Sequence, residues 1–255
     1  MRFASLGSGS KGNATLVEAG GTRVLIDCGF SCAEAEKRLA RLSLSPADLD
    51  AILVTHEHAD HISGVARLSR RHALPVWMTA GTEAAHKGGE PAAWHCINSH
   101  RAFRIGNLEI EPFPVPHDAR EPCQFVFSDG RRRLGLLTDV GSLTVHLLQA
   151  LEGLDALILE CNHDPGMLAT GPYPDSLKQR VGGPFGHLSN QQAADIISKI
   201  STDRLQHLVA AHISEKNNRP QLALGCLAEA VGESRFGILA ADQPSGMPWI
   251  DIDPA

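Results

Sequence analysis

The sequence lacks the features that mark secreted, membrane-spanning or zinc-ribbon proteins. Its six cysteines are scattered over 255 residues without a CxxC pair, so neither a disulfide framework nor a zinc ribbon is indicated. No run approaches the roughly 18 apolar residues of a membrane-spanning helix, and the amino terminus has no apolar signal-peptide segment. These absences predict a cytoplasmic protein with reduced thiols and no membrane partner.

An excess of positive charge is also missing, because the formal net charge is -6. Proteins that bind nucleic acid usually neutralise phosphates with Lys and Arg, so this balance counts against a DNA or RNA partner. Two bound divalent cations would, however, add about +4 of charge that a sequence sum omits. The basic stretches at residues 67–72 and 131–133 are only weak support for DNA, since such runs are usually solvent-exposed surface.

What the chain does have is 43% hydrophobic residues at a length that predicts one domain over residues 1–255. Strand patterns dominate the first half, and helices and strands alternate in the second half. Together they predict two sheets sandwiched between helices. The predicted strands are 2–6, 14–19, 22–28, 51–55, 75–79, 108–115, 155–160, 205–212 and 236–241, and the stretch 123–139 is predicted to hold two more joined by a hairpin turn at Asp129-Gly130. The predicted helices are 31–42, 63–72, 142–151, 189–200 and 220–231. The Pro- and Gly-rich stretch 169–186 is predicted to be a functional loop with a short helix.

Gly7, Gly9 and Gly12 match the dinucleotide-binding pattern GxGxxG, but their context contradicts it. That pattern requires a helix to open at the third glycine, whereas residues 13–27 read as a hairpin. A P-loop is excluded as well, because Asn13 stands where lysine is required. Two interpretations are left: a Ser/Gly loop whose N–H groups approach an anion, or an ordinary tight turn.

The stretch VTHEHADHISG, residues 54–64, concentrates metal-ligand side chains directly after an apolar strand. His56 and His58 can converge on one ion, while Asp60 and His61 point to a second position beside it. Two ions need more ligands, and His117, Asp139 and His212 each stand at or just beyond an apolar run. The predicted partition assigns His56, His58 and His117 to one ion, Asp60, His61 and His212 to the other, and Asp139 to a bridging position. Imidazole and carboxylate ligands suit zinc, manganese, iron, cobalt or nickel, so the ion stays open.

The motif HxHxDH followed by a later His, Asp and His resembles the metallo-β-lactamase fold superfamily. The segments GSGSKGN, VPHDAREP, LLTDVG, LECNHDPGML, GHLSN and HISEKNNRP are similar to its WalJ/YycJ subfamily, bacterial proteins linked to exonuclease activity on double-stranded DNA. Cys161 stands where that subfamily has serine. The resemblance implies an αββα four-layer sandwich of the metallo-β-lactamase type, two divalent metal ions (Zn, Mn or Fe) and a DNA substrate.

The same resemblance suggests catalytic roles. His187 in GHLSN is similar to a histidine near the metals of RNase Z enzymes, and it would donate a proton to the leaving oxygen. Glu160 or His163 would orient His187 or grip a phosphate, although His163 could equally be a structural hydrogen-bonding residue. Asp60 is the candidate to hold or accept the proton of the attacking water.

Substrate contacts are predicted on two sides of the metals. The candidates are Ser8, Ser10, Lys11 and Asn13 on one side and Asn217 and Asn218 on the other. The remaining histidines have no convergent partners in the sequence and are assigned to surface or core; they are His72, His86, His95, His100, His146 and His207.

Two ions around one activated water suit the in-line displacement of a phosphodiester. The sequence therefore predicts a dinuclear metal-dependent phosphodiesterase, and the resemblance specifies a 5′-to-3′ exonuclease on double-stranded DNA. A secreted β-lactamase would need a signal peptide, a flavo-diiron protein would have Glu at His58, and a β-CASP nuclease would need more chain between Asp139 and His212. Glyoxalase II-like thioester hydrolysis shares HxHxDH but not the GHLSN and NHD segments.

Two alternatives stay open: a phosphodiesterase for small linear or cyclic substrates, and a non-catalytic metal-binding signalling domain. A degenerate, non-catalytic member is expected to have lost a ligand, and here none of the seven candidates is missing. The sequence leaves the oligomeric state open.

Overall fold

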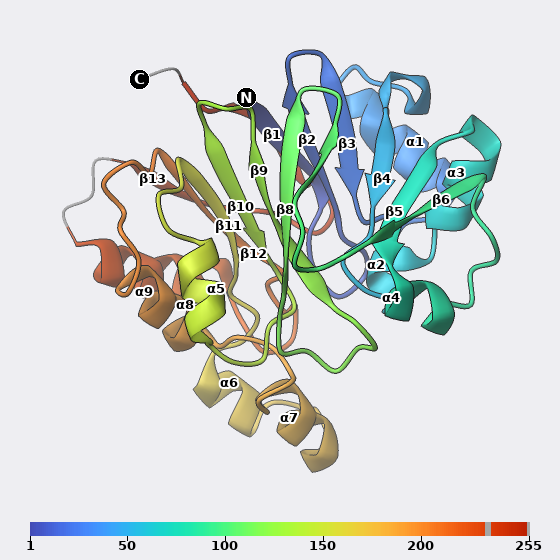
Figure 1. Cartoon of the computed structure of the whole chain (residues 1–255). Helices are drawn as coiled ribbons and strands as arrows, with labels where there is room; N and C mark the ends of the chain where they lie inside the picture. The colour runs from blue at the N-terminus through green and yellow to red at the C-terminus, as the bar shows by residue number, and fades with distance from the viewer. Residues whose placement is uncertain (233–235, 254–255) are drawn as a thin grey trace.

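Two seven-stranded sheets lie face to face in the computed structural model, which describes residues 1–232 and 236–253 (Figure 1). In spatial order, the first sheet consists of β14 (Met247–Asp251), β1 (Arg2–Gly7), β2 (Ala14–Ala19), β3 (Thr22–Ile26), β4 (Ala51–Leu53), β5 (Pro75–Thr79) and β6 (Ala93–Ile97). The second consists of β13 (Gly237–Ala240), β12 (His207–Ala211), β11 (Ala156–Glu160), β10 (Arg133–Leu137), β9 (Cys123–Ser128), β8 (Leu108–Pro114) and β7 (Phe103–Ile105).

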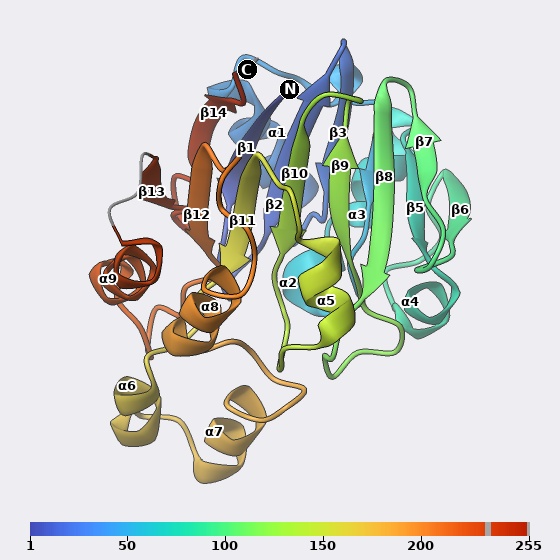
Figure 2. The same ribbon diagram turned by 60° about the vertical axis from the view of Figure 1, so that its left-hand side comes forward.

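Helices cover the outer face of each sheet, as Figures 1 and 2 show. The helices are α1 (Cys32–Arg41), α2 (Ala59–Ile62), α3 (Val65–His72), α4 (Ala80–Ala85), α5 (Val145–Ala150), α6 (Pro165–Thr170), α7 (Asp175–Val181), α8 (Asn190–Ile197) and α9 (Pro220–Val231), with a 3₁₀ turn at Pro46–Asp48. Helices α1 and α3 pack on the first sheet, and α5, α8 and α9 pack on the second. In the described parts of the chain, no helix has the length and hydropathy needed to cross a membrane.

Three apolar layers hold this arrangement together. One fills the space between the sheets and contains Phe3, Phe125 and Phe127, while the other two lie beneath the helices on either side. Such layers form because each sheet is apolar on both faces and must bury both. The predicted αββα sandwich is therefore confirmed.

The hairpin predicted over residues 13–27 is also confirmed, since β2 pairs antiparallel with β3. Gly20 and Gly21 make the turn with φ values of 55° and 86°, a region that glycine enters without steric cost. No helix opens at Gly12, so the rejection of a dinucleotide-binding loop is correct.

Several elements differ from the sequence prediction. Helix α5 begins only at Val145, where the Thr144 side chain accepts a hydrogen bond from the backbone N–H of Leu147 and so caps the helix. Helix α2, the short turn within the histidine motif, was not predicted because polar ligand residues hide its period. Strand β6 was missed as well: it lies at the sheet edge and buries only Ile97, so it has no alternating apolar pattern.

The parallel strands end at one common edge of the sandwich. Strands β3, β4 and β5 are parallel in the first sheet, and β10, β11 and β12 are parallel in the second. Figure 2 shows α6 and α7 lying beyond this edge, apart from the main body of the sandwich. Loops that leave both sheets here can therefore build one shared site.

Candidate metal centre

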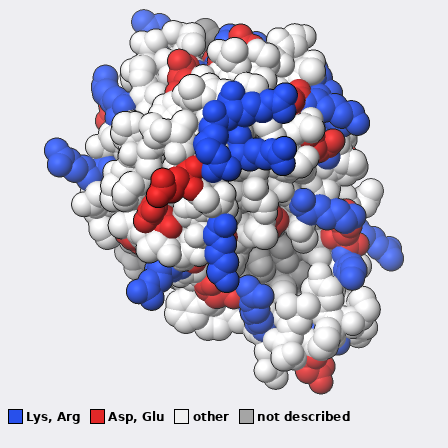
Figure 3. Space-filling model, turned by 90° about the vertical axis from the view of Figure 1, so that its right-hand side faces the viewer, with Lys and Arg blue, Asp and Glu red and all other residues white. Residues whose placement is uncertain are grey.

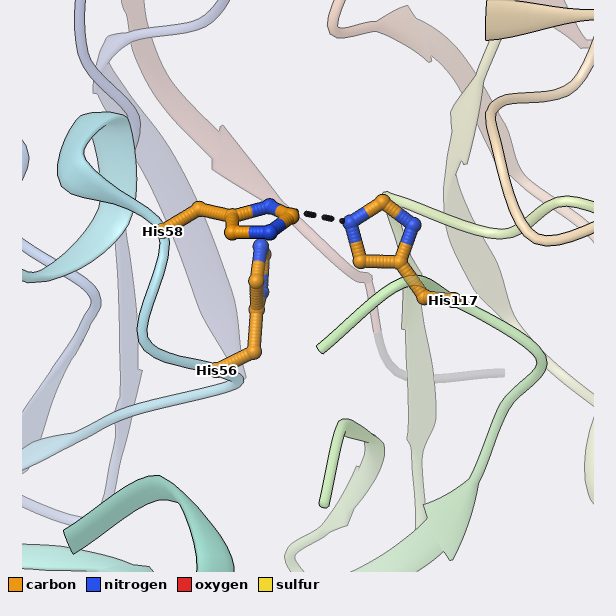
Figure 4. A group of neighbouring side chains, drawn as sticks. All are labelled: His56, His58 and His117. Atoms are coloured by element: carbon orange, nitrogen blue, oxygen red, sulfur yellow. Dashed lines mark hydrogen bonds between the residues drawn. The ribbon is translucent and has the colours of Figure 1, made fainter. Parts of the chain in front are cut away.

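Three imidazoles converge where the loop after β4 meets the loop after β8. His56, His58 and His117 bring ligand atoms within 4.8 Å of one another. His117 Nε2 lies 3.2 Å from His58 Nδ1, and the ring centroids of His56 and His117 are 4.9 Å apart. Figure 4 shows His56 and His58 on one chain segment facing His117 on another. This is the first of the two groups predicted from sequence.

A second group forms beside it from Asp60, His61 and His212. Asp60 Oδ2 lies 3.5 Å from the Nε2 atom of both His61 and His212. Asp139 lies against both groups, with Oδ2 3.1 Å from His61 Nε2 and Oδ1 3.9 Å from His117 Nε2. The structure thus brings all seven predicted ligands together, and Asp139 occupies the position between the two groups.

Three buried polar atoms in this cluster make no well-formed hydrogen bond among the described residues, although Asp139 Oδ2 lies 3.1 Å from His61 Nε2 and His212 Nε2 lies 3.5 Å from Asp60 Oδ2. They are His56 Nε2, His212 Nε2 and Asp139 Oδ2. A buried polar atom left unsatisfied costs about 1–3 kcal/mol, so three in one place indicate a missing partner. A cation coordinated by imidazole nitrogen and carboxylate oxygen satisfies all three atoms. The residues present therefore fit a metal centre.

The other ring nitrogen of each buried imidazole is held by an oxygen partner. Such partners orient metal-ligating histidines and leave the second nitrogen facing the ion. The four Nδ1 contacts are His56 to Thr55 Oγ1 at 2.9 Å, His61 to Asp27 Oδ2 at 2.8 Å, His117 to the Gly186 carbonyl at 3.0 Å and His212 to Glu160 Oε1 at 3.1 Å.

Left-handed backbone conformations recur around the centre. Asp27, Asp139 and His212 have φ values of 61°, 55° and 50°. A non-glycine residue in this region is uncommon and costs of the order of 1–3 kcal/mol. Each of these residues follows closely after a strand, and its side chain contacts another member of the centre.

Several known proteins are similar to this chain in sequence or in fold. The family model described as "Beta-lactamase superfamily domain" matches residues 22–213. Exodeoxyribonuclease YycJ of Bacillus anthracis is 36% identical over 242 residues, which cover 93% of this chain and 92% of that protein. Exodeoxyribonuclease WalJ of Streptococcus pneumoniae is 31% identical over 244 residues, which cover 93% of this chain and 91% of that protein. The chain belongs to the metallo-β-lactamase superfamily.

Within the superfamily it is WalJ/YycJ-like, as the sequence motifs predicted. The metallo-β-lactamase fold protein YhfI of Bacillus subtilis superposes with a TM-score of 0.72, covering 98% of this chain and 99% of that one at 18% identity, which supports the fold. Because it belongs to this superfamily and carries these His/Asp groups, the chain is a metal-dependent hydrolase whose site takes two divalent metal ions. The non-catalytic alternative is not favoured.

Charge in this metallo-β-lactamase site is balanced between carboxylates and imidazoles. Burial alone would lower the pKa of His212, but Asp139, Asp60 and Glu160 outweigh it and raise that pKa to about 10. Burial would raise the pKa values of Asp60 and Asp139, yet the neighbouring His61 and His212 hold both below the usual range. Asp139 also acts to raise the pKa of His56, but burial and the neighbouring His61 outweigh it and keep that pKa well below 6.5.

His187 lies beside Glu160 rather than within the two ligand groups. Its Nδ1 is 2.8 Å from Glu160 Oε1 and 3.5 Å from Asp139 Oδ1. Burial opposes protonation, but Glu160 and then Asp139 outweigh it and raise the pKa of His187. Glu160 is itself fixed, because Oε2 accepts hydrogen bonds from the backbone N–H groups of Val140 and Leu188. Despite full burial the pKa of Glu160 falls to about 2, mainly because of His187.

His163 is placed differently from His187. Burial lowers its pKa, and its Nδ1 atom is buried without a hydrogen-bond partner among the described residues. It does not line the pocket described below. Either Glu160 or His163 was predicted from the sequence to orient His187. The structure shows this contact for Glu160.

Most of the residues predicted to contact substrate at the amino-terminal loop make contacts within the protein. Ser8 Oγ accepts a hydrogen bond from the backbone N–H of His212, and the exposed Lys11 forms an ion pair with Glu215. The Asn13 amide lies 3.2 Å from Asp60 Oδ2 and 3.0 Å from His61 Nε2. Of the four residues predicted here, Ser10 lines the pocket.

The two asparagines predicted on the opposite side are buried. Asn218 exchanges hydrogen bonds with Asn190 and also donates to the Cys161 carbonyl. The Asn217 side chain has no hydrogen-bond partner among the described residues, but it is fully enclosed. In this arrangement neither amide reaches the pocket that a phosphate would enter.

A pocket of about 350 Å³ opens over the metal groups. His58, Asp60, Asp139, His187 and His212 line one side, and residues from the stretch 173–181 line the other. Tyr173 and Arg180 on this second side, and Asp118 beside His58, were not predicted from the sequence. The Pro- and Gly-rich stretch 169–186 was the signal for Tyr173 and Arg180, because it was predicted to be a functional loop.

The contacts of two further residues, Asp27 and His72, were not predicted from the sequence. Asp27 was not among the predicted site residues, although it directly follows β3, beside the strand that leads to the histidines. Its carboxylate accepts hydrogen bonds from Thr55 as well as contacting His61. The statement that His72 has no convergent partner is wrong, because its Nε2 lies 2.9 Å from Glu36 Oε1.

Proposed function

We propose that this chain is a metal-dependent exonuclease that digests double-stranded DNA in the 5′-to-3′ direction. The observation that carries the proposal is the complete set of seven convergent ligands facing an open pocket, in a chain 36% identical over 93% of its length to an exodeoxyribonuclease. We assign His56, His58 and His117 to one ion, Asp60, His61 and His212 to the other, and Asp139 to both. A single domain in the cytoplasm is part of this proposal, because DNA is encountered there.

When bound, the two ions supply Lewis acidity that activates water and neutralises charge on the phosphate. Asp60 presents an ionised carboxylate to the pocket and can accept a hydrogen bond from the attacking water. His187 is oriented through Nδ1 by Glu160, and the carboxylates of Glu160 and Asp139 raise its pKa and so favour the protonated imidazole. It can therefore donate a proton to the leaving oxygen as a general acid.

The negative net charge of the protein does not prevent DNA from approaching, because positive and negative side chains are unevenly distributed over the surface. Figure 3 shows Lys and Arg side chains gathered on the upper part of one face of the molecule. A local basic surface attracts phosphate even when the net charge is -6.

The proposal is tested by incubating the purified protein with Mn²⁺ and duplex DNA labelled at either the 5′ or the 3′ end. We expect the 5′ label to be released first as a mononucleotide, with the 3′ label retained in shortening strands. Bis(p-nitrophenyl) phosphate is assayed in parallel. Hydrolysis of that small ester with intact duplex would replace the exonuclease by a small-molecule phosphodiesterase.

A further inference from the structure

The wall of the pocket opposite the metal groups has no role in the chemistry described above. It is formed by Tyr173, Leu177, Arg180 and Val181, which belong to α7 and the residues before it. We propose that this wall is a binding subsite for one unpaired nucleotide at the DNA end, in which Tyr173 stacks on the base and Arg180 binds a phosphate. The inference rests on the proposed nuclease function and names the form of DNA that enters the site.

The size of the pocket supports a single nucleotide. Pockets for small ligands span about 300–1,000 Å³, so the volume of about 350 Å³ is close to the lower limit. A base pair with both of its backbones does not fit into such a space. The end of a duplex must therefore open before its terminal nucleotide reaches the metal groups, as in enzymes that extrude a base into a pocket.

Arg180 is positioned to bind a phosphate near the metals. Its Nε donates a hydrogen bond to Asp118, whose other carboxylate oxygen lies 3.7 Å from His58 Nε2. The ion pair with Asp118 holds the guanidinium beside the first metal group, while the Arg180 side chain is still 58% exposed. The Nη atoms carry the remaining N–H donors, in the planar arrangement that suits phosphate oxygens.

Tyr173 supplies the aromatic surface that a base requires. The side chain is half-buried in the pocket wall, and Lys216 Nζ lies 5.7 Å from its ring centroid. Stacking on an aromatic side chain tolerates any base, because every base has a π face. A subsite of this kind suits an exonuclease, which must accept all four terminal nucleotides in turn.

The chain contains a single tyrosine, so this side chain can be observed selectively. Protein containing 3-fluorotyrosine should give one ¹⁹F resonance, which we expect to shift on addition of deoxyadenosine 5′-monophosphate but not of deoxyribose 5-phosphate. By calorimetry, the nucleotide should bind about 5- to 150-fold more tightly than the sugar phosphate, the range expected for one stacked base.

The variants separate the two contacts. Tyr173→Ala should remove the preference for the nucleotide over the sugar phosphate, and Tyr173→Phe should restore it because the ring is retained. Arg180→Ala should weaken binding of both ligands. Gln179→Ala, an exposed neighbour on α7 that does not line the pocket, is the control and should leave both affinities unchanged.

Equal affinity of the wild type for nucleotide and sugar phosphate, or unchanged preference in Tyr173→Ala, would overturn the subsite. This result is distinct from failure of the proposed function. Absence of duplex digestion, with the base preference intact, would remove the exonuclease and leave a nucleotide-binding site.

Discussion

His58 and His187 both line the pocket, yet their surroundings assign them different work. His58 Nδ1 lies 3.2 Å from His117 Nε2, inside a group of three imidazoles, whereas His187 Nδ1 lies against the Glu160 carboxylate. The first environment suits coordination of a cation, and the second suits a histidine that carries a proton. Substitution of each residue should therefore separate metal content from rate.

We expect His58→Ala to lower metal content and to abolish turnover, because the substitution removes a direct ligand. Metal is measured by elemental analysis and turnover with end-labelled duplex. His146→Ala, an exposed histidine on α5, is the matched control and should keep both properties. Wild-type activity in His58→Ala would contradict the assignment of ligands.

For His187→Ala we expect retained metal and a rate reduced by about 10²- to 10⁴-fold, the usual contribution of a general acid. Loss of metal in this variant would instead make His187 a ligand.

The variant Glu160→Gln tests whether His187 is the general acid, through the pH dependence of kcat. Glu160 raises the pKa of His187, and a general acid loses activity as the pH rises through its pKa. Replacing the carboxylate should lower that pKa and move the basic limb of the kcat profile to lower pH. Because Glu160 also contacts His212, metal content must be shown to be unchanged. A basic limb in the same place would exclude Glu160 as the group that tunes His187.

Among individual residues, the sequence predicted the seven converging side chains, because each stands at or just beyond the end of an apolar run. It did not predict which amides are available to a substrate. Asn13 and Asn218 are used by hydrogen bonds within the protein, and such bonds depend on distant segments that meet only in the folded chain. Tyr173 and Arg180 were missed because their importance comes from facing the metals, which a stretch without regular spacing does not reveal.

Among the elements, the loop from Ser8 to Asn13 depends on a residue more than two hundred positions away. Gln243 Oε1 accepts a hydrogen bond from the backbone N–H of Lys11, and its Nε2 donates to the Gly12 carbonyl, both at 2.8 Å. The loop in turn contacts His212 through Ser8 and Asp60 through Asn13. The segment after β13 thus supports the metal centre without contributing a ligand.

We expect Gln243→Ala to destabilise the protein by about 1–3 kcal/mol, because one buried and one partly buried backbone group lose their partners. Metal affinity should fall as well, since the loop positions Asp60 and His212. Gln206 offers a matched control, because its amide makes the same pair of backbone hydrogen bonds with Asp253 far from the metals. Denaturant unfolding and metal titration of both variants measure the two effects, and equal metal affinities would show that the loop does not position the ligands.

The elements that the sequence predicted well were those with a buried face, such as α1 and β11. Helix α2 and strand β6 were missed for a physical reason: one is dominated by ligands and the other is exposed along most of its length. Apolar periodicity reports burial, so elements that bury little are invisible to it.

For the whole molecule, the ligands are divided between the two sheets. His56, His58, Asp60 and His61 follow β4 of the first sheet, whereas His117, Asp139 and His212 follow strands of the second. Bound ions therefore link the two halves of the sandwich in the folded state only, and binding to the folded state alone raises stability.

Removal of metal with a chelator should lower the melting temperature by about 5–10 °C. This estimate follows from about 2.7 kcal/mol of binding free energy at a hundredfold excess over Kd and about 2–4 °C per kcal/mol in a protein of this size. Differential scanning calorimetry with and without Mn²⁺ measures the shift, and His58→Ala should respond less than wild type. Identical melting temperatures of the metal-loaded and metal-free protein would argue against ions that bridge the sheets.

The apolar layer between the sheets also sets the distance between the two sets of metal ligands. Phe3 and Phe125 belong to opposite sheets of that layer, and their bulk contributes to the separation between the sheets that carry the two sets of ligands. Closely packed interiors respond to a change of even one methylene group. Substitutions deep in the hydrocarbon interior, far from any nucleotide, can therefore widen or narrow the gap across which the ions are held, so the choice of metal becomes partly a property of the core.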